Sequence, residues 1–377
     1  MPTRTANAPN KTNGSNIMKR TLILTSALCG LAFAAQAQNK EVNVVSWGGS
    51  YEKSQVEAYN KPFQEKTGIK VNMIAADNPA TPLKAQVEAN NITGDVFDIE
   101  TSDAIRLCDE GALMEIDPAT LPAAPDGTPA SEDFIPGALQ DCAVANIFWG
   151  TVIAFDSTKF TDAKPSTAAD FFDTAKFPGK RGLPKAPKRT LYLALIADGV
   201  APDQIYETLA TPEGVDRAFK KLDTIKKDVV WWEAGAQPVQ LLADGEVTMA
   251  TGYNGRFFDA MVAEGKPFEI IWDGQYMDMD MFAIPKGAPN PEAAMEYLKF
   301  ATDTQRLADQ AKWIAYGPAR KSSAALVGLY QDGKTEMAPH MPTNPDHMTT
   351  AVMDDPEFWA DHSAELSERF NSWLAAG

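Results

Sequence analysis

The sequence VNVVSWGGSYEKSQVEAYNKPF at residues 42–63 predicts a strand, a tight turn and a helix in direct succession. Its first five residues form a β-rich run, and the WGGS that follows supplies the turn. The helix comes next, because Val56, Tyr59 and Phe63 recur at helical spacing and therefore share one face. A strand that leads directly into a helix is the repeating unit of α/β folds.

The same alternation continues on the C-terminal side of this unit. Gly68 ends the helix, Ile69–Ile74 and Val96–Glu100 are predicted strands, and Leu83–Ala89 is the predicted helix between them. Another helix begins near Ala104. Strands and helices that alternate at this spacing predict a parallel sheet with helices on both faces.

Residues 18–40, MKRTLILTSALCGLAFAAQAQNK, have the pattern of a cleavable export signal. Lys19 and Arg20 precede an apolar run, and Ala35-Gln36-Ala37 is a small-x-small cleavage site. The run is too short to span a bilayer, so we expect an exported protein that is not inserted in the membrane. Met18 is an alternative start to Met1.

A long apolar run, Val144–Asp156, predicts a buried strand that crosses between two lobes. A second set of strands and helices follows at residues 181–251, and Met277–Pro285 is expected to carry the chain back. Two lobes also fit the length, because about 340 residues exceed what one hydrophobic core normally serves. We divide the chain into the signal with its N-terminal extension (1–37), the first lobe (38–148), the second lobe (149–280), a return to the first lobe (281–330) and a C-terminal helical segment (331–377).

The chain is strongly acidic. Without residues 1–37, which carry four basic and no acidic residues, the 34 Lys and Arg fall to 30 against 51 Asp and Glu, and the formal charge changes from -17 to -21. Such a surface repels nucleic acid and anionic lipid, and we expect neither as a partner. It is compatible with a cationic or zwitterionic small ligand, although it is more typical of a device for solubility. We expect a monomer.

Only Cys108 and Cys142 follow the export signal, and an even pair in an exported protein predicts a disulfide. The histidines, His340, His347 and His362, all lie near the C-terminus, which excludes most His-dependent catalysis and metal binding. The sequence has no GxGxxG, no Walker loop and no G-x-S-x-G elbow. We therefore predict no catalytic residue, no metal site and no cofactor.

Aromatic residues gather at the ends of predicted strands and in turns. In doubly wound sheets, ligands bind beyond the carboxyl ends of the strands, so these rings are expected to meet in one cleft. A cage of rings suits an alkyl chain with a cationic end, because each ring face attracts the cation by roughly 0.5–2 kcal/mol. Each tryptophan alone is more typical of a core, to which we assign Trp231 and Trp272. The ring candidates are Trp47, Tyr51, Trp149, Trp232, Tyr253 and Tyr316.

Charged candidates accompany the rings. Asp278 and Asp280 alternate on a predicted strand and face the same side, where a carboxylate can bind an ammonium group; Asp280 is the stronger candidate of the two. Arg256 follows a strand end and can offer a fork to a carboxylate, or else pair with Asp259 on the surface. If Arg256 and Asp280 both face the cleft, the ligand should be a zwitterion. If only Asp280 does, a diamine fits better.

Several segments together resemble the periplasmic solute-binding proteins of polyamine-type (spermidine/putrescine) ABC importers, over essentially the whole chain after the signal. These are SWGGSY at 46–51, CDEGALMEID at 108–117, WWEAGAQPVQLLADGE at 231–246, YNGR at 253–256, MDMFAIPKGAPN at 279–290 and YGPARK at 316–321. The resemblance implies a type II periplasmic binding fold, in which two α/β lobes joined by crossover strands close over an amine. It also implies delivery of that amine to a membrane permease.

The resemblance assigns roles to individual residues. Trp47 and Tyr51 match an aromatic pair of the first lobe, with one extra residue between them, Tyr253 matches an aromatic floor, and Tyr316 matches a late cleft tyrosine. Asp280 matches the carboxylate that binds ammonium. The remaining binding candidates follow predicted strand ends or lie beside residues already named, and are Ser102, which falls where a ring is common, Asp103, Trp149, Trp232, Arg256 and Asp278.

The departures from the family pattern concern charge. Arg256 stands where diamine binders carry a small polar residue, and Lys188 and Arg189 stand where acidic contacts to a second ammonium are expected. Putrescine-like diamines therefore compete with ω-amino acids such as γ-aminobutyrate as the predicted ligand. The alternatives are a sugar or another small solute, and an exported hydrolase that uses Asp103 and Asp280 as its acid and base.

Overall fold

The computed structural model describes residues 41–376. The predicted export signal lies outside this range. The strands are β1 (Glu41–Ser46), β2 (Lys70–Ala75), β3 (Val96–Glu100), β4 (Leu139–Gln140), β5 (Ala143–Asp156), β6 (Arg181–Pro184), β7 (Val229–Trp232), β8 (Met249–Tyr253), β9 (Phe268–Ala283), β10 (Gly317–Pro318) and β11 (Val352–Met353).

Helices connect most of these strands. The α-helices are α1 (Gly49–Gln55), α2 (Lys61–Thr67), α3 (Ala80–Glu88), α4 (Thr101–Asp109), α5 (Ala130–Asp133), α6 (Ala168–Phe172), α7 (Lys188–Ala197), α8 (Ile205–Leu209), α9 (Pro212–Asp223), α10 (Gln237–Ala243), α11 (Asn254–Val262), α12 (Pro291–Ala301), α13 (Thr304–Gln310), α14 (Lys321–Ala324) and α15 (Pro356–Ala375). A π-helical turn at Val56–Asn60 joins α1 to α2. The helix predicted after the WGGS turn therefore consists of three consecutive helical elements.

The described strands form one sheet in the order β2-β1-β3-β9-β5-β8-β6-β7. Strands β1, β2 and β3 are parallel to one another, and so are β6, β7 and β8. Between these two groups, β9 and β5 run antiparallel to each other and to their outer neighbours. The parallel sheet predicted from the βα alternation is thus found on each side of an antiparallel pair. We call the part built on β1–β3 the first lobe and the part built on β6–β8 the second lobe.

The two central strands pass from one hydrophobic core to another. The first residues of β5, Ala143–Ala145, pack with Val44, Phe97 and Tyr297 of the first lobe, whereas Ile153 and Phe155 near its other end pack with side chains of the second lobe. Strand β9 makes the return crossing, because Met281–Ala283 belong to the first core and Ile271 belongs to the second. Both predicted crossings are therefore present, and most of the run predicted at Met277–Pro285 forms the second half of the longer strand β9.

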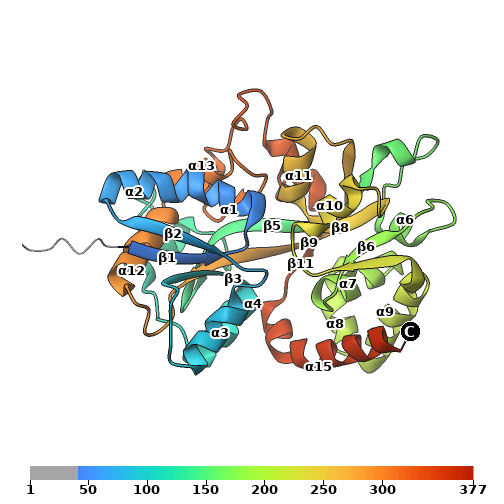
Figure 1. Ribbon diagram of the computed structural model, residues 1–377, viewed down its shortest axis with the longest axis horizontal. Helices are drawn as coiled ribbons and strands as arrows, with labels where there is room; N and C mark the ends of the chain where they lie inside the picture. The colour runs from blue at the N-terminus through green and yellow to red at the C-terminus, as the bar shows by residue number, and fades with distance from the viewer. Residues whose placement is uncertain (1–40, 377) are drawn as a thin grey trace, which may run out of the picture. The chain divides into compact units, whose positions relative to one another are not determined.

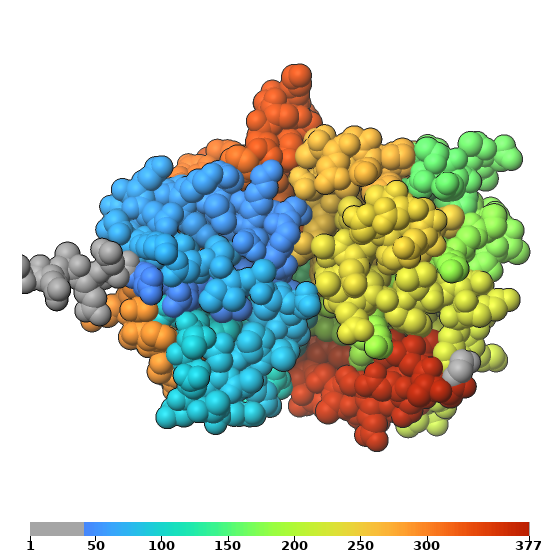
Figure 2. Space-filling view, in the orientation of Figure 1, coloured from blue at the N-terminus to red at the C-terminus, as the bar shows by residue number. Residues whose placement is uncertain are grey.

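Helices of the two lobes meet above and below the crossing strands. Figure 1 shows α1 beside α11 on one side of the sheet, and on the other side α15, which packs in the second core, contacts α4 of the first lobe. In Figure 2 the surface of the first lobe (blue) meets that of the second (yellow and gold) along a line near the middle of the face. The predicted C-terminal helical segment is an α-helix from Pro356 onward and mostly irregular before it. The lobe boundaries given above remain a prediction.

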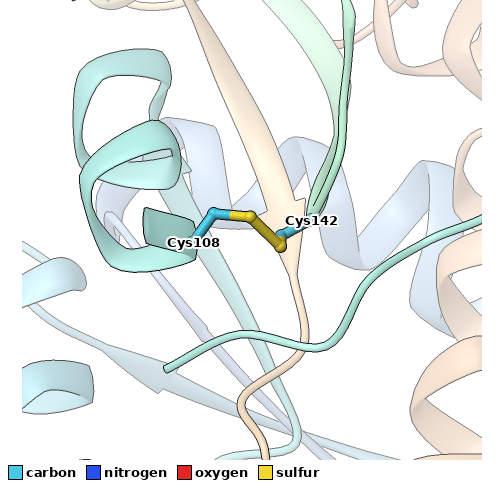
Figure 3. The surroundings of a disulfide bond; sticks show 2 residues. All are labelled: Cys108 and Cys142. Carbon is cyan, nitrogen blue, oxygen red and sulfur yellow. A yellow bond between two sulfur atoms is a disulfide. The ribbon is translucent and has the colours of Figure 1, made fainter. Parts of the chain in front are cut away.

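The predicted disulfide is present. Cys108 near the end of α4 is bonded to Cys142, the residue before β5 (Figure 3). The bond ties a first-lobe helix to the start of a crossing strand, and the two cysteines are separated by 34 positions in sequence. Among residues 41–376, no helix is both long and apolar enough to cross a membrane.

Candidate ligand-binding site

A cavity of about 370 Å³ lies where strand ends of both lobes meet the crossing strands. First-lobe residues come from the segments after β1 and β2 and from the last residue of β3, and second-lobe residues come from the segment before α10 and from the β8–α11 junction. This is the position at which α/β sheets bind ligands, beyond the carboxyl ends of their strands. The lining residues are Trp47, Gly48, Gly49, Tyr51, Ala75, Ala76, Asp77, Glu100, Trp149, Ala234, Gly235, Ala236, Tyr253, Arg256, Asp280 and Tyr316.

The structure brings together most of the residues predicted to bind a ligand. Those that line the cavity are Trp47, Tyr51, Trp149, Tyr253, Arg256, Asp280 and Tyr316. Four others, Ser102, Asp103, Trp232 and Asp278, do not line it. The rings that line the cavity thus share one enclosure with Arg256 and Asp280, although these residues come from positions up to 269 residues apart in sequence.

The rings pack edge to face around the cavity. Tyr51 and Tyr316 have centroids 5.6 Å apart at 73°, and Trp149 and Tyr253 have centroids 5.1 Å apart at 80°. Trp47 is half-buried and packs on the same cluster. Edge-to-face pairs of this kind hold each other in orientation and present faces to a third group. The walls are therefore suited to an alkyl chain.

A buried carboxylate fixes the ring of Tyr51. Asp98 Oδ2 accepts hydrogen bonds from the Ser46 hydroxyl (2.9 Å), the Tyr51 hydroxyl (2.8 Å) and Gln55 Nε2 (2.6 Å), and Asn146 Nδ2 donates to Oδ1 (3.2 Å). Burial raises the pKa of Asp98 to about 6, although the four donors act to lower it. Asp98 lies behind the cavity wall and holds the Tyr51 ring in its orientation.

Asp280 presents a buried acid to the cavity. Only 5% of this residue is exposed, and its one hydrogen-bond donor among the described residues is Trp149 Nε1, at 3.0 Å from Oδ1. Burial and the neighbouring carboxylates Asp98 and Glu100 raise the pKa of Asp280 well above its ordinary value. A carboxyl group with spare acceptor capacity and no paired cation is a site that a ligand ammonium group would stabilise.

Arg256 reaches from α11 of the second lobe to the first lobe. Its Nη2 donates to the carbonyl oxygen of Trp47 at 3.0 Å, and its guanidinium lies 5.8 Å from the centroid of the Tyr253 ring. Gly49 permits this approach, because it has φ +66° and a Cβ there would lie 2.5 Å from Nη1 of Arg256. Asp259, the alternative surface partner, instead accepts a hydrogen bond from Tyr330.

Asp278 and Ser102 both accept hydrogen bonds from Lys188. Lys188 Nζ donates to Asp278 Oδ2 (2.8 Å), Glu100 Oε2 (3.2 Å), Asp354 Oδ2 (3.2 Å) and Ser102 Oγ (3.2 Å). Asp278 and Ser102 therefore contact this internal ammonium group and do not line the cavity, and their role in ligand binding stays a prediction. Asp278 and Asp280 do share one face of β9, but only Asp280 reaches the cavity.

Asp103 and Trp232 lie elsewhere for equally local reasons. Asp103 pairs with Arg106 one helical turn away, at 2.7 Å, and lines a separate small pocket with Ser102. Trp232 is buried behind Tyr253, with ring centroids 6.2 Å apart. Asp103 and Asp280, the proposed pair of the hydrolase alternative, thus line different pockets. In the described part of the chain, no group of three or more His, Cys, Asp or Glu side chains is placed to hold a metal ion.

The sequence interpretation missed Glu100, Asp77 and Gly235. Glu100 ends β3, Asp77 follows β2 closely and Gly235 lies between β7 and α10, so all three obey the strand-end rule that identified the other candidates. Arg189 Nη1 donates to Glu100 Oε1 at 2.6 Å. Burial acts to raise the pKa of Glu100, but Lys188 and Arg189 together lower it to about 2, so this carboxylate is already neutralised by the protein.

Two α/β lobes that enclose an aromatic and charged cavity at their strand ends define a binding protein of the type II periplasmic class. The chain belongs to the bacterial extracellular solute-binding protein family, whose profile matches residues 58–343. The fold class and the family resemblance predicted from the sequence are confirmed, and the protein is a solute-binding protein.

Relatives and solved structures show what the chain is similar to. It is 42% identical to a gamma-aminobutyric acid-binding protein of Pseudomonas aeruginosa, over 93% of this chain and 96% of the relative. It is 23% identical to a spermidine/putrescine-binding periplasmic protein of Salmonella typhimurium, over 84% and 90%. The PBP MotA from A. tumefaciens B6, solved with glucopine, superposes with a TM-score of 0.80 at 31% identity (89% and 99% covered). A solved GABA receptor superposes at 0.75 with 34% identity (90% and 98% covered).

Proposed function

We propose that the protein captures a small zwitterion with well-separated amino and carboxyl groups, such as γ-aminobutyrate, for a periplasmic ABC importer. The observation that carries the proposal is that Arg256 and Asp280 line the same cavity. Asp280 would accept a charge-assisted hydrogen bond from the ligand ammonium group. Arg256 would offer a planar fork to the ligand carboxylate, and the rings would cover the methylenes between.

The charges favour a zwitterion over a diamine. A diamine brings two cations, yet the acid beside Asp280, Glu100, is already paired with Lys188 and Arg189. A second ammonium group near Arg256 would meet a like charge. Two relatives of more than 30% identity carry γ-aminobutyrate in their names, which supports the same ligand class here.

Closure of the cleft would follow from the same contacts. Asp280 lies on a crossing strand and Arg256 on the second lobe, while Trp47 and Tyr51 belong to the first. A ligand that touches all of them stabilises the closed arrangement and shifts the population toward it. No covalent bond changes, so the protein acts as a carrier and not as an enzyme. The closed form would then deliver the ligand to a membrane permease that is driven by a separate ATPase.

The export pattern and the disulfide support a periplasmic location. Residues 18–37 have the sequence of a cleavable signal, and Cys108–Cys142 suits an oxidising compartment. The acidic surface fits a protein that binds neither nucleic acid nor anionic lipid.

Titration calorimetry of the protein without residues 1–37 tests the proposed ligand class. We expect saturable binding of γ-aminobutyrate, with butylamine, butyrate and putrescine each weaker by roughly ten- to a hundredfold, because each leaves one buried charged group unpaired. A putrescine affinity equal to or above that of γ-aminobutyrate would contradict the zwitterion proposal, and so would the absence of heat from every ω-amino acid.

Binding is also expected to release a proton at pH values below the raised pKa of Asp280. Burial and the neighbouring carboxylates raise that pKa in the empty site, and a ligand ammonium group favours the ionised form. The affinity should therefore rise with pH through the pKa of Asp280. Calorimetry in phosphate and in Tris, whose ionisation heats differ, measures the proton. Identical observed enthalpies in the two buffers would show that Asp280 does not change its protonation state.

A further inference from the structure

The ammonium group of Lys188 lies inside a cage of acidic groups. Lys188 is the first residue of α7 in the second lobe, and its side chain is only 13% exposed. Its partners come from three separate segments, because Glu100 ends β3, Asp278 lies within β9, and Asp354 follows β11. The Tyr276 hydroxyl, which also donates to Asp354, holds that carboxylate in place. Such a cage is how a protein binds an alkylammonium cation, and here the cation is its own.

This cage adjoins the ligand cavity. Glu100 belongs to both, since it lines the cavity and accepts hydrogen bonds from Lys188 and Arg189. Asp278 and Asp280 are two residues apart on the same face of β9, a separation of roughly 7 Å along a strand. The Lys188 ammonium group therefore binds a carboxylate, Asp278, that is two residues along β9 from Asp280, the carboxylate proposed to bind the ligand amine.

We propose that Lys188 is a specificity-determining residue, whose ammonium group fills the place that the second cation of a diamine would otherwise occupy and so excludes putrescine-like ligands. This inference rests on the proposed function, in which Asp280 binds one ligand amine. A diamine anchored at Asp280 has its other nitrogen within reach of the cage formed by Glu100, Asp278 and Asp354. Lys188 pairs with these acids, so they cannot bind the ligand, and its positive charge repels a second ammonium group.

The exclusion is permanent over the physiological pH range. Burial acts to lower the pKa of Lys188, but Asp278, Asp354 and Glu100 together raise it well above its ordinary value. The lysine thus stays charged. Arg189 supports the arrangement, because it remains paired with Glu100 and lies 5.8 Å and 5.6 Å from the centroids of the Trp149 and Tyr253 rings that form the cavity wall.

Replacement of the lysine tests the inference. In Lys188→Met, which keeps the alkyl bulk, the ratio of putrescine affinity to γ-aminobutyrate affinity should rise by roughly ten- to a hundredfold over wild type, because acids without a cation now accept the second ammonium group. Lys188→Arg, which keeps the charge, should retain the wild-type preference. Lys185→Met is the matched control, since Lys185 is exposed and its ammonium group pairs with Glu233 at the surface. In Lys185→Met, the ratio of putrescine affinity to γ-aminobutyrate affinity should equal that of wild type.

The loss of a buried cation could unfold the protein, so a second variant is included. Lys188→Met/Asp354→Asn removes one acid of the cage and leaves Glu100 and Asp278 for a diamine. If neither variant folds alone, folding in excess putrescine is expected, because the ligand supplies the missing charge. Failure of putrescine to rescue folding overturns the inference.

The outcomes separate the two proposals. Folded variants that bind γ-aminobutyrate but gain no putrescine affinity overturn the role of Lys188 alone. A wild-type protein that already prefers putrescine overturns the proposed function and this inference together. A putrescine affinity that rises in Lys188→Met and is unchanged in Lys185→Met supports both proposals.

Discussion

Arg256→Gln is expected to weaken γ-aminobutyrate binding by roughly a hundred- to a thousandfold. The guanidinium is the cation that lines the cavity, and its fork can give a carboxylate two charge-assisted hydrogen bonds. Without it, the ligand carboxylate would be desolvated against a neutral amide, at a cost of about 3–4 kcal/mol. Calorimetry with γ-aminobutyrate and with butylamine measures the effect, and butylamine should lose far less.

The fold must be intact for that comparison. The substitution removes one hydrogen bond, to the Trp47 carbonyl, so the melting temperature of the ligand-free variant should fall only slightly. Arg217→Gln is the matched control, because Arg217 is exposed and pairs with Asp198 at the surface. An unchanged response of Arg256→Gln to γ-aminobutyrate would mean that the ligand carboxylate binds elsewhere.

Most of the secondary structure could be predicted because its signals are local. The β-rich run before Trp47 and the helical spacing of Val56, Tyr59 and Phe63 lie within a few residues of each other, and each produced the expected element type. The single strand β9 was divided in the prediction, because Gly274 and Gln275 interrupt its apolar pattern. The structure carries the strand through Gly274 at φ +67°, next to an irregularity in its pairing with β5.

The differences between the predicted site residues and the residues that line the cavity arise partly from charge pairs that are distant in sequence. Nothing near Asp278 in the sequence indicates that Lys188, 90 residues away, takes its carboxylate. Asp103 is different, because its partner Arg106 stands at helical i,i+3 spacing, and that signal was available. Strand alternation does not exclude Trp232, because Trp231 was already assigned to the core, and the ring against which Trp232 packs, Tyr253, is distant in sequence.

The same electrostatics separate the acids of the cleft into two kinds. Glu100 is paired with Lys188 and Arg189, which lower its pKa, whereas Asp280 has no paired cation among the described residues and has a raised pKa. Only an acid that the protein leaves uncompensated can gain much from a ligand cation. The pairing of Glu100 with two cations therefore supports Asp280 as the proposed position for the ligand amine.

Asp280→Asn is expected to reduce γ-aminobutyrate affinity by roughly a hundred- to a thousandfold and to raise the melting temperature of the ligand-free protein at neutral pH. Affinity falls because the ligand ammonium group would be buried against a neutral amide. Stability rises because the folded-state pKa of Asp280 is raised, so its favourable contribution is present at low pH and is lost as pH increases. Asparagine keeps the acceptor for Trp149 and removes the repulsion from Asp98 and Glu100.

Melting curves from acidic to neutral pH distinguish this effect from a general change in stability. The difference in melting temperature between Asp280→Asn and wild type should grow as pH rises, whereas Asp216→Asn, an exposed control, should show no such trend. The variant should also lose the release of a proton on binding. If Asp280→Asn melts below wild type at neutral pH while still binding γ-aminobutyrate tightly, then the buried acid stabilises the fold and does not receive the ligand amine. A stabilised variant that has lost binding would show the opposite, that the cleft maintains an unfavourable charge because the ligand requires it.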